Sequence, residues 1–350
     1  MNSASAINLL SRLIATPSLT REEEHSAQLL YDQMVSLGYA PQRIENNLIV
    51  YNKRFSPDLP TVVLCSHHDT VRPNENYIRD PFAPTVEDGK LYGLGSNDAG
   101  ASLVSLLATF DHFYPMELKG CNLCLLLTAE EESSGHKGMG IMYDQIINPQ
   151  LVIVGEPTSM DVAIAERGLM VLDCEVVGVS GHAAHDNTVN PIIKALDDIR
   201  WFNDYRFEKR SEMLGDVKMS VTVISAGTTH NVVPGKCHFT VDVRNNGLYS
   251  NLEILERIKA NVECVVTARS TRLGASSIEP SHPFVECCVR HGSKIFGSST
   301  LSDQALVSCL SVKIGVGDTH RSHTADEYVL IDEVEEGIDR YIKILTDYIL

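Results

Sequence analysis

Three short apolar runs, each followed by acidic or histidine residues, most constrain how this chain can fold. Residues 61–65 lead into Ser66-His67-His68-Asp69, residues 123–129 into Glu130-Glu131-Glu132, and residues 151–154 into Gly155-Glu156-Pro157. Continuous apolar runs of this length are typical of buried parallel strands in an α/β sheet. Because ligands bind beyond the carboxyl ends of such strands, we expect these polar side chains to gather at one site.

The side chains that would gather there are histidines and carboxylates, which indicates a metal centre. Two further segments supply ligands of the same kind: residues 93–98 and residues 318–323. The candidate ligands are then His67, Asp98, Glu132, Glu156 and His323. Imidazole and carboxylate without thiolate suit Zn²⁺, and also Co²⁺ or Mn²⁺, and leave room for water. Five ligands fit two metals bridged by one carboxylate, so the sequence predicts metal-dependent hydrolysis.

The ligands lie in five short motifs that follow one another along nearly the whole chain. They are a His-x-Asp motif at 67–69, a glycine-rich aspartate motif at 93–98, a double-glutamate motif within 130–132, a Gly-Glu-Pro motif at 155–157 and a His-x-x-Asp-Glu motif at 323–327. In this order the motifs resemble the M20 family of metallopeptidases and amino-acid deacylases. The closest resemblance is to its acetylornithine deacetylase and succinyl-diaminopimelate desuccinylase branch.

The resemblance implies how the metal ligands are divided. His67 and Glu156 would bind one metal, Glu132 and His323 the other, and Asp98 would bridge the two. The motif 318–323 also contains His320, which competes with His323 for the ligand role.

Two more residues receive catalytic roles from the resemblance. Asp69 would orient His67, because a carboxylate bonded to the far imidazole nitrogen fixes the tautomer and raises the basicity of the ligating nitrogen. Glu131 would be the general base that takes a proton from a metal-bound water. Because Glu130, Glu131 and Glu132 form a triplet, this assignment could slip by one position.

The middle of the chain predicts a second domain. Residues 169–275 have the order βαββαβ, a split-βαβ unit that packs two helices on one face of an antiparallel sheet, as in ferredoxin-like domains. We therefore expect a zinc-hydrolase-like α/β catalytic domain formed by residues 1–168 and 276–350, with 169–275 inserted as a lid and dimerisation domain. Within the catalytic domain, Thr20 and Glu23 predict a capping box for a helix over 23–37, and further helices are expected near 283–296 and 333–350.

Three residues of the inserted domain match further family positions. The resemblance implies that His182 stabilises the oxyanion, often in the neighbouring subunit's active site, so a homodimer formed through this domain is expected. It also implies that Arg244 grips the α-carboxylate of the substrate through two parallel hydrogen bonds and that Asn231 binds substrate.

Composition excludes several other functions. A formal net charge of -17 argues against nucleic acid as a partner, because phosphates require a basic surface. No apolar run approaches the roughly 20 residues that cross a bilayer, and the first residues do not resemble a signal peptide, so no membrane partner and a cytoplasmic location are expected. The 9 cysteines are expected to be reduced core thiols.

The substrate expected first is a small N-acylated amino acid, as for an acetylornithine deacetylase in arginine biosynthesis. Alternatives are an N-succinyl-amino-acid desuccinylase acting on succinyl-ornithine, succinyl-citrulline or succinyl-diaminopimelate, an acetylcitrulline deacetylase, or a dipeptidase or aminopeptidase. A succinyl group would need a second cation, for which the candidates are Arg72, Lys137, Arg167 and Arg321. A non-catalytic metal-binding protein is the alternative from a different class.

Overall fold

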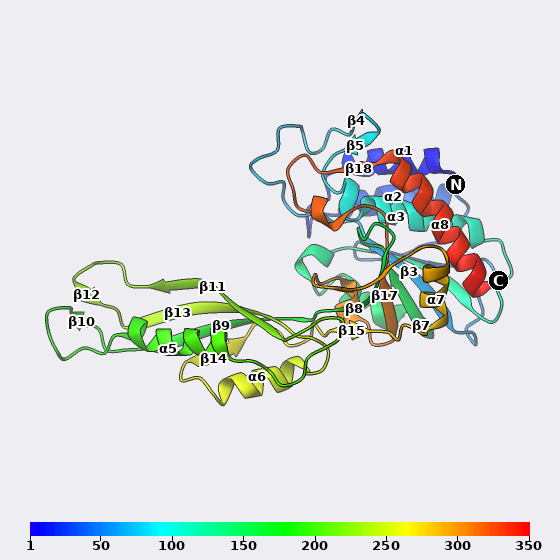
Figure 1. Ribbon diagram of the computed structural model, residues 1–350. Helices are drawn as coiled ribbons and strands as arrows, with labels where there is room; N and C mark the ends of the chain where they lie inside the picture. The colour runs from blue at the N-terminus through cyan, green and yellow to red at the C-terminus, as the bar shows by residue number, and fades with distance from the viewer. The chain divides into compact units, whose positions relative to one another are not determined.

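The chain forms two compact units in the computed structural model, which describes residues 1–350 (Figure 1). Unit 1 contains Met1–Ile164, Ser277–Phe296 and Ser302–Leu350, and unit 2 contains Ala165–Ser276 and Gly297–Leu301. The segment 297–301, which the sequence analysis placed in the catalytic domain, groups with unit 2. There a Cβ on Gly297 would lie only 2.4 Å from the Met213 carbonyl oxygen, so the two backbones pack closely.

The main sheet of unit 1 has nine strands, and its centre is parallel. The strand order is β1-β2-β6-β3-β7-β17-β8-β15, with β16 paired to β8. The three apolar runs form β3 (Thr61–His67), β6 (Asn122–Thr128) and β7 (Pro149–Val154), which lie parallel, and β17 (Leu310–Lys313) is parallel to β7. The remaining strands are β1 (Gln42–Ile44), β2 (Asn47–Tyr51), β8 (Val162–Glu166), β15 (Ser276–Ser277) and β16 (Ile295–Ser298).

Both faces of this sheet are buried, which explains why its strands are continuously apolar. Along β3, Val62 and Leu64 contribute to one core cluster, whereas Val63 and Cys65 contribute to a second cluster. The first cluster also contains residues of α1, α2, α3, α7 and α8, and the second contains residues of α4. Their bounds are α1 (Ser3–Ile14), α2 (Glu24–Ser36), α3 (Ala101–Phe113), α4 (Met139–Met142), α7 (Pro283–Arg290) and α8 (Ile331–Ile349). A small sheet β18-β5-β4 joins β4 (Thr85–Glu87), β5 (Lys90–Tyr92) and β18 (Tyr328–Leu330).

Two local predictions for unit 1 were wrong. The helix α2 begins near the expected residue but has no capping box, because the Thr20 hydroxyl donates to Asp69 Oδ2 at 2.8 Å and not to the helix. The helix α7 ends at Arg290, and Ile295–Ser298 forms β16, where a single helix to residue 296 was expected. Gly292, with φ of 89°, terminates the helix in the left-handed conformation that glycine tolerates.

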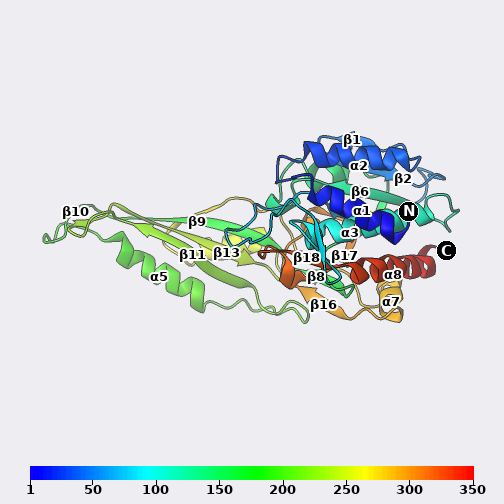
Figure 2. The same cartoon turned by 90° about the horizontal axis from the view of Figure 1, so that it is seen from above.

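Unit 2 is the predicted split-βαβ fold. Its antiparallel sheet β11-β13-β9-β14 is built from β9 (Leu169–Val177), β11 (Lys218–Ala226), β13 (Lys236–Arg244) and β14 (Val265–Ala268). The helices α5 (Pro191–Asp204) and α6 (Asn251–Lys259) pack on one face through a shared core. A two-strand ladder of β10 (Gly181–His182) with β12 (Val232–Val233) forms the tip of the unit in both Figure 1 and Figure 2.

Two further observations concern the cysteines and the helices. All nine cysteines are free thiols, and most of them are buried. Every helix is either too short or too polar to cross a bilayer.

Candidate metal centre

The register of the parallel strands brings three of the sequence motifs to one edge of the sheet. His67 is the last residue of β3 and lies opposite Thr128 of β6, and Cys65 lies opposite Val154 of β7. The glutamates after β6 and Glu156 after β7 therefore emerge beside His67. The carboxyl ends of neighbouring parallel strands form the crevice where α/β folds bind ligands.

Asp98 lies between two histidines from distant parts of the chain. Its Oδ1 is 3.3 Å from His67 Nε2, and its Oδ2 is 3.6 Å from His323 Nε2. His67 Nε2 is also 3.7 Å from Glu156 Oε1, and His323 Nε2 is 3.0 Å from Glu132 Oε2. The structure thus assembles all five candidate ligands, with one Asp98 oxygen directed at each histidine.

The donor set fits divalent cations. His67, Glu131 and Glu156 place ligand atoms within 4.8 Å of one another, and so do His67, Asp98 and Glu132. Glu156 Oε1 is buried and has no hydrogen-bond partner. Because an unpaired buried charge is costly, this oxygen is suited to a bound cation.

The carboxylates of the site strongly influence one another's ionisation. Burial raises the pKa of Glu156 to about 8, although the nearby charges of His67 and Lys313 oppose the shift. Burial also raises the pKa of Glu131 well above its usual range, with the neighbouring Glu156 and Asp303 adding to the effect. Two divalent cations would compensate the charge of the four carboxylates at positions 98, 131, 132 and 156.

Asp69 contacts both the histidine and the glutamate motif. His67 Nδ1 lies 2.9 Å from the main-chain oxygen of Asp69 and 3.5 Å from its carboxylate. The same carboxylate accepts the backbone N–H groups of Glu131 at 3.0 Å and Glu132 at 3.2 Å. Asp69 therefore fixes the loop that carries these glutamates, a contact that sequence spacing did not reveal.

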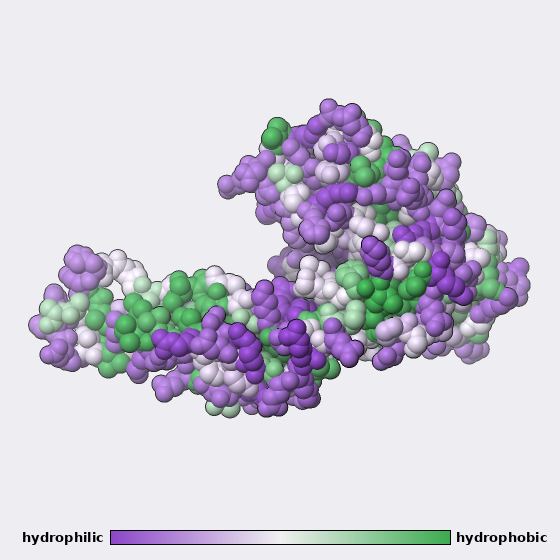
Figure 3. Space-filling model, viewed as in Figure 1, coloured by the Kyte–Doolittle hydropathy of each residue, from purple (hydrophilic) through white to green (hydrophobic).

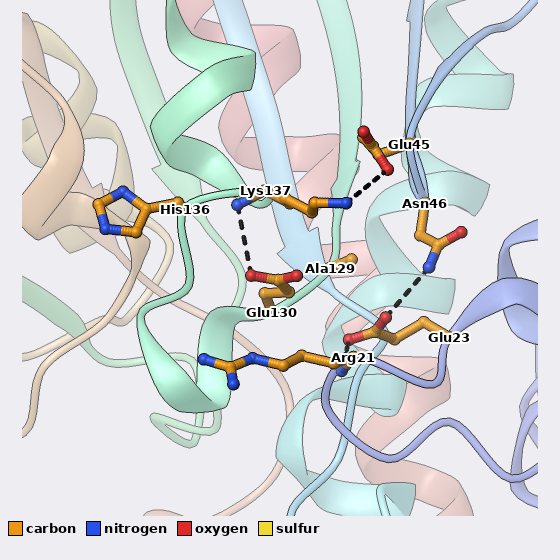
Figure 4. Close-up of a pocket in the computed structure, with 8 residues that line it drawn as sticks. All are labelled: Arg21, Glu23, Glu45, Asn46, Ala129, Glu130, His136 and Lys137. Carbon is orange, nitrogen blue, oxygen red and sulfur yellow. Dashed lines mark hydrogen bonds and ion pairs between the residues drawn. The ribbon is translucent and has the colours of Figure 1, made fainter.

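Side-chain direction separates Glu130 from the other two glutamates of the triplet. Glu131 and Glu132 approach His67 and His323, whereas Glu130 lines a separate pocket of about 400 Å³ (Figure 4). Glu130 has φ of 56°, and its Oε2 accepts the backbone N–H of Lys137 at 3.3 Å. Glu130 therefore takes no direct part in the cluster.

The choice between the two closing histidines is also decided by the structure. The His320 side chain is 89% exposed and lies 2.8 Å from the carboxylate of its neighbour Asp318. His323 faces Asp98 and Glu132 and has the left-handed φ of 59°. His323 is therefore the histidine that completes the cluster.

Three of the four cations considered for a succinyl group have other partners. Arg321 forms a two-pronged ion pair with Glu333 at 2.6 and 3.0 Å. Lys137 pairs with Glu45 at 3.2 Å, and Arg167 donates to main-chain oxygens within unit 2. Arg72 is 78% exposed and only loosely paired, with Glu22 at 3.6 Å.

The three candidate residues of unit 2 lie in two separate places. His182 in β10 and Asn231 beside β12 lie together, and Ala183 N–H donates to the Asn231 carbonyl at 3.0 Å. Arg244 is at the far end of β13, eight residues beyond Lys236, which corresponds to roughly 27 Å of strand. Its guanidinium already binds Asp242 through contacts of 2.9 and 3.1 Å.

Sequence reasoning missed two residues that support the cluster. Thr20 donates to Asp69, and Glu327 accepts the backbone N–H groups of Asn97 and Asp98 at 2.8 and 3.0 Å. Glu327 ends the closing motif, so its position was visible in the sequence although its role was not.

Comparison with known proteins places these features in a family. The sequence profile of peptidase family M20/M25/M40 matches residues 63–347. A succinyl-diaminopimelate desuccinylase from Zymomonas mobilis is 28% identical over 279 residues, covering 74% of this chain and 73% of the relative. One from Delftia acidovorans is 25% identical, covering 97% of both chains.

Solved structures share the fold at low sequence identity. The aminopeptidase PepT from Bacillus cereus has a TM-score of 0.79 with 15% identity, covering 99% of both chains. A tripeptidase from Staphylococcus aureus has a TM-score of 0.78 with 18% identity, covering 98% of both chains. A dinuclear metal-binding M20 peptidase from Bacillus subtilis has a TM-score of 0.72 with 16% identity, covering 99% of this chain and 98% of that one.

Proposed function

The chain belongs to peptidase family M20/M25/M40 and is a metallohydrolase of amide bonds, and we propose from this premise that it removes the succinyl group from an N-succinylated amino acid. The observation that carries the hydrolase site is Asp98, whose two oxygens face His67 and His323. The two relatives named as desuccinylases support the succinyl alternative over the acetylornithine reading.

Two metal ions are proposed to bind this cluster, with Zn²⁺ first and Co²⁺ or Mn²⁺ as substitutes. His67 and Glu156 would hold one ion, Glu132 and His323 the other, and Asp98 both. When bound, such ions polarise an amide carbonyl and lower the pKa of water from about 16 to about 7. The B. subtilis relative described as dinuclear supports this stoichiometry.

Glu131 is proposed to move the proton. Its carboxylate reaches within 4.0 Å of His67 Nε2, at the edge of the cluster. It would accept the proton of the attacking water and return it to the nitrogen of the leaving amine. A carboxyl whose pKa is raised by burial can hold that proton near neutral pH, as this shuttle requires.

The two carboxylates of the substrate are proposed to bind different arginines. Arg72 follows the Asp69 motif on a loop whose Asn74 side chain donates to the His323 carbonyl at 3.2 Å. Its exposure and loose pairing leave it available for the succinyl carboxylate. Arg244 would bind the α-carboxylate with the part of its guanidinium that Asp242 does not occupy, and Asn231 would add a polar contact.

A homodimer is proposed, with His182 acting as oxyanion donor in the other subunit. His182 is at the tip of unit 2, whereas the chain enters and leaves this unit near Ala165 and Ser276. Apolar side chains gather over β11 and α5 (Figure 3), among them Val223, Ile224, Ile193 and Leu196, which are 46–60% exposed. Since β11 is an edge strand, pairing with a second copy would cover it.

The deciding experiment measures amine release from a matched panel of substrates. The panel contains succinyl and acetyl derivatives of diaminopimelate, ornithine, citrulline and lysine, together with simple dipeptides. Preference for succinyl substrates that is lost in Arg72→Met, with acetyl turnover unchanged, would support the proposal. Preference for acetylornithine would restore the first expectation, preference for dipeptides would favour a peptidase, and metal uptake without turnover would favour a binding protein.

A further inference from the structure

The segment that presents Asp98 has backbone hydrogen bonds near its two ends, from Ser96 N–H to the Gly93 carbonyl at 3.1 Å and from Gly100 N–H to the Gly95 carbonyl at 3.0 Å. It runs from Gly93 to Gly100, between β5 and α3, and Asp98 has the non-helical angles φ of -116° and ψ of 99°. Gly95 has φ of 75°, so the backbone reverses direction just before the ligand. The buried N–H groups of such a turn need acceptors from elsewhere in the fold.

One residue, Glu327, accepts three of these N–H groups. Its carboxylate Oε1 accepts the N–H of Asn97 at 2.8 Å and that of Asp98 at 3.0 Å. Its main-chain oxygen accepts the N–H of Gly93 at 3.0 Å. The pairing of β18 with β5 sets Tyr328 opposite Tyr92, and this register holds Glu327 beside the start of the turn.

The orientation of Asp98 matters because its two oxygens face different histidines. A small rotation of the Asp98 backbone would bring one oxygen closer to His67 and take the other away from His323. The Glu327 side chain is only 1% exposed, and a buried carboxylate is tolerated where hydrogen bonds satisfy it. The N–H groups of Asn97 and Asp98 donate these hydrogen bonds to the Glu327 carboxylate. The same bonds fix the backbone orientation at Asn97 and Asp98.

We propose that Glu327 is a positioning residue that sets the bridging orientation of Asp98 and thereby the affinity of the site for a pair of metal ions. It acts through the backbone of Asn97 and Asp98 and is not itself a ligand. This inference rests on the proposed metal centre. Supporting residues of this kind typically contribute about 10–100-fold to metal affinity.

The test compares Glu327→Leu and Glu327→Gln with a matched control. Gln retains an oxygen that can accept both N–H groups, whereas Leu does not. Asp198→Leu is the control, because Asp198 is also buried and accepts the N–H groups of Glu263 and Cys264 at 2.9 and 3.0 Å within unit 2. Co²⁺ affinity and the visible spectrum of bound Co²⁺ are measured for each protein.

We expect Glu327→Leu to lose about 10–100-fold in Co²⁺ affinity with a changed spectrum, while Glu327→Gln stays closer to wild type and Asp198→Leu matches it. Equal loss in Glu327→Leu and Asp198→Leu, or wild-type binding in Glu327→Leu, would overturn the proposal. If Glu327→Leu does not fold, Glu327→Asp decides, because its shorter side chain draws the carboxylate away from the N–H groups of Asn97 and Asp98. Wild-type Co²⁺ affinity, spectrum and amide exchange in Glu327→Asp would also overturn the proposal.

The exchange measurement separates this inference from the proposed function. It is made on the metal-free protein, where faster exchange of the Asn97 and Asp98 amides in Glu327→Leu, but not in Glu327→Gln, shows that the carboxylate holds the turn. If the wild-type protein does not bind metal, the proposed metal centre is wrong. If amide exchange at Asn97 and Asp98 is unchanged in Glu327→Leu, only the proposed role of Glu327 is wrong.

Discussion

At the scale of single residues, the site is defined by the direction of each side chain. The three consecutive glutamates are chemically alike, but Glu130 lines its own pocket while Glu131 and Glu132 face the histidines. Asp69 accepts hydrogen bonds from the backbone N–H groups of Glu131 and Glu132. Substitutions at these positions should therefore differ in their effects on activity, metal binding and stability.

Replacing the proposed base should separate catalysis from metal binding. In Glu131→Gln we expect kcat to fall by about 10²–10⁴-fold, because a general base contributes that much to such reactions. Metal content measured after dialysis should stay at the wild-type level. A drop in bound metal would instead make Glu131 a ligand, and a kcat within tenfold of wild type would exclude it as the base.

The buried His68 should make the fold sensitive to acid. Burial lowers the pKa of His68 to about 4, and its ring nitrogens lie 2.9 Å from Ser26 Oγ and 2.9 Å from the Asn46 carbonyl. Between pH 6.5 and 4 the unfolded chain binds a proton that the folded chain does not. Stability is therefore lost as pH falls, by about 2 kcal/mol from pH 7 to pH 5 for this residue.

Urea unfolding of the metal-free protein at both pH values measures this loss. Comparison with His68→Gln isolates the residue, because every other titrating group is shared. An equal pH dependence in the two proteins would show that His68 does not resist protonation.

At the scale of elements, the loops after the strands are held by close backbone packing. Gly138 ends the loop that carries the glutamates, and a Cβ there would lie 2.1 Å from the Ala129 carbonyl oxygen. Because the obstructing atom belongs to the backbone, it cannot simply rotate away. The loop conformation thus depends on glycine at this position.

Gly138→Ala should consequently disturb both stability and activity. We expect a loss of about 1–3 kcal/mol in the free energy of unfolding, as for other overpacked sites, together with reduced kcat. The control is Gly140→Ala, because a Cβ there meets only the Gly135 oxygen at 3.8 Å and lies in α4. Denaturant unfolding should show no loss for this control, and equal effects of the two substitutions would contradict the packing argument.

At the scale of the whole molecule, the question is whether one subunit completes its own site. His182 lies in the β10–β12 ladder at the tip of unit 2, whereas Arg244 lies at the far end of β13, so the two residues have different surroundings within one chain. The proposed dimer accounts for this separation by supplying His182 from a second copy.

Mixed dimers test whether His182 acts in the active site of the other subunit. Glu131→Gln and His182→Asn should each be nearly inactive alone. If subunits exchange randomly, half of the dimers are hybrids with one intact site, so turnover should recover to about a quarter of the wild-type value. No recovery after verified subunit exchange would show that His182 acts within its own subunit or not at all.

The exposed apolar surface of unit 2 allows a second check of the dimer. Leu196→Glu on α5 should shift the protein to monomers in sedimentation velocity, because it places a charge in the proposed interface. Leu252→Glu on α6 is the matched control, since Leu252 is 59% exposed but lies on the other helix. A wild-type oligomeric state in Leu196→Glu would place any interface elsewhere.

The sequence by itself determined the parallel α/β core and the split-βαβ unit, and it named the five candidate ligands that the fold brings together. These follow from local patterns: apolar runs mark buried strands, and the polar residues after them lie at the carboxyl ends whatever the detailed packing. The capping box at Thr20 failed because the hydroxyl finds a tertiary partner, Asp69, that a local pattern cannot include.

Only the tertiary structure decided which of several similar residues belongs to the site. Glu131 differs from Glu130, and His323 from His320, in backbone angles and in neighbours that are far away in sequence. The support that Glu327 gives to Asp98 spans 229 residues of chain. The contacts of Glu327 depend on the register of β18 with β5. This register arises when the whole core packs and is not encoded in any short motif.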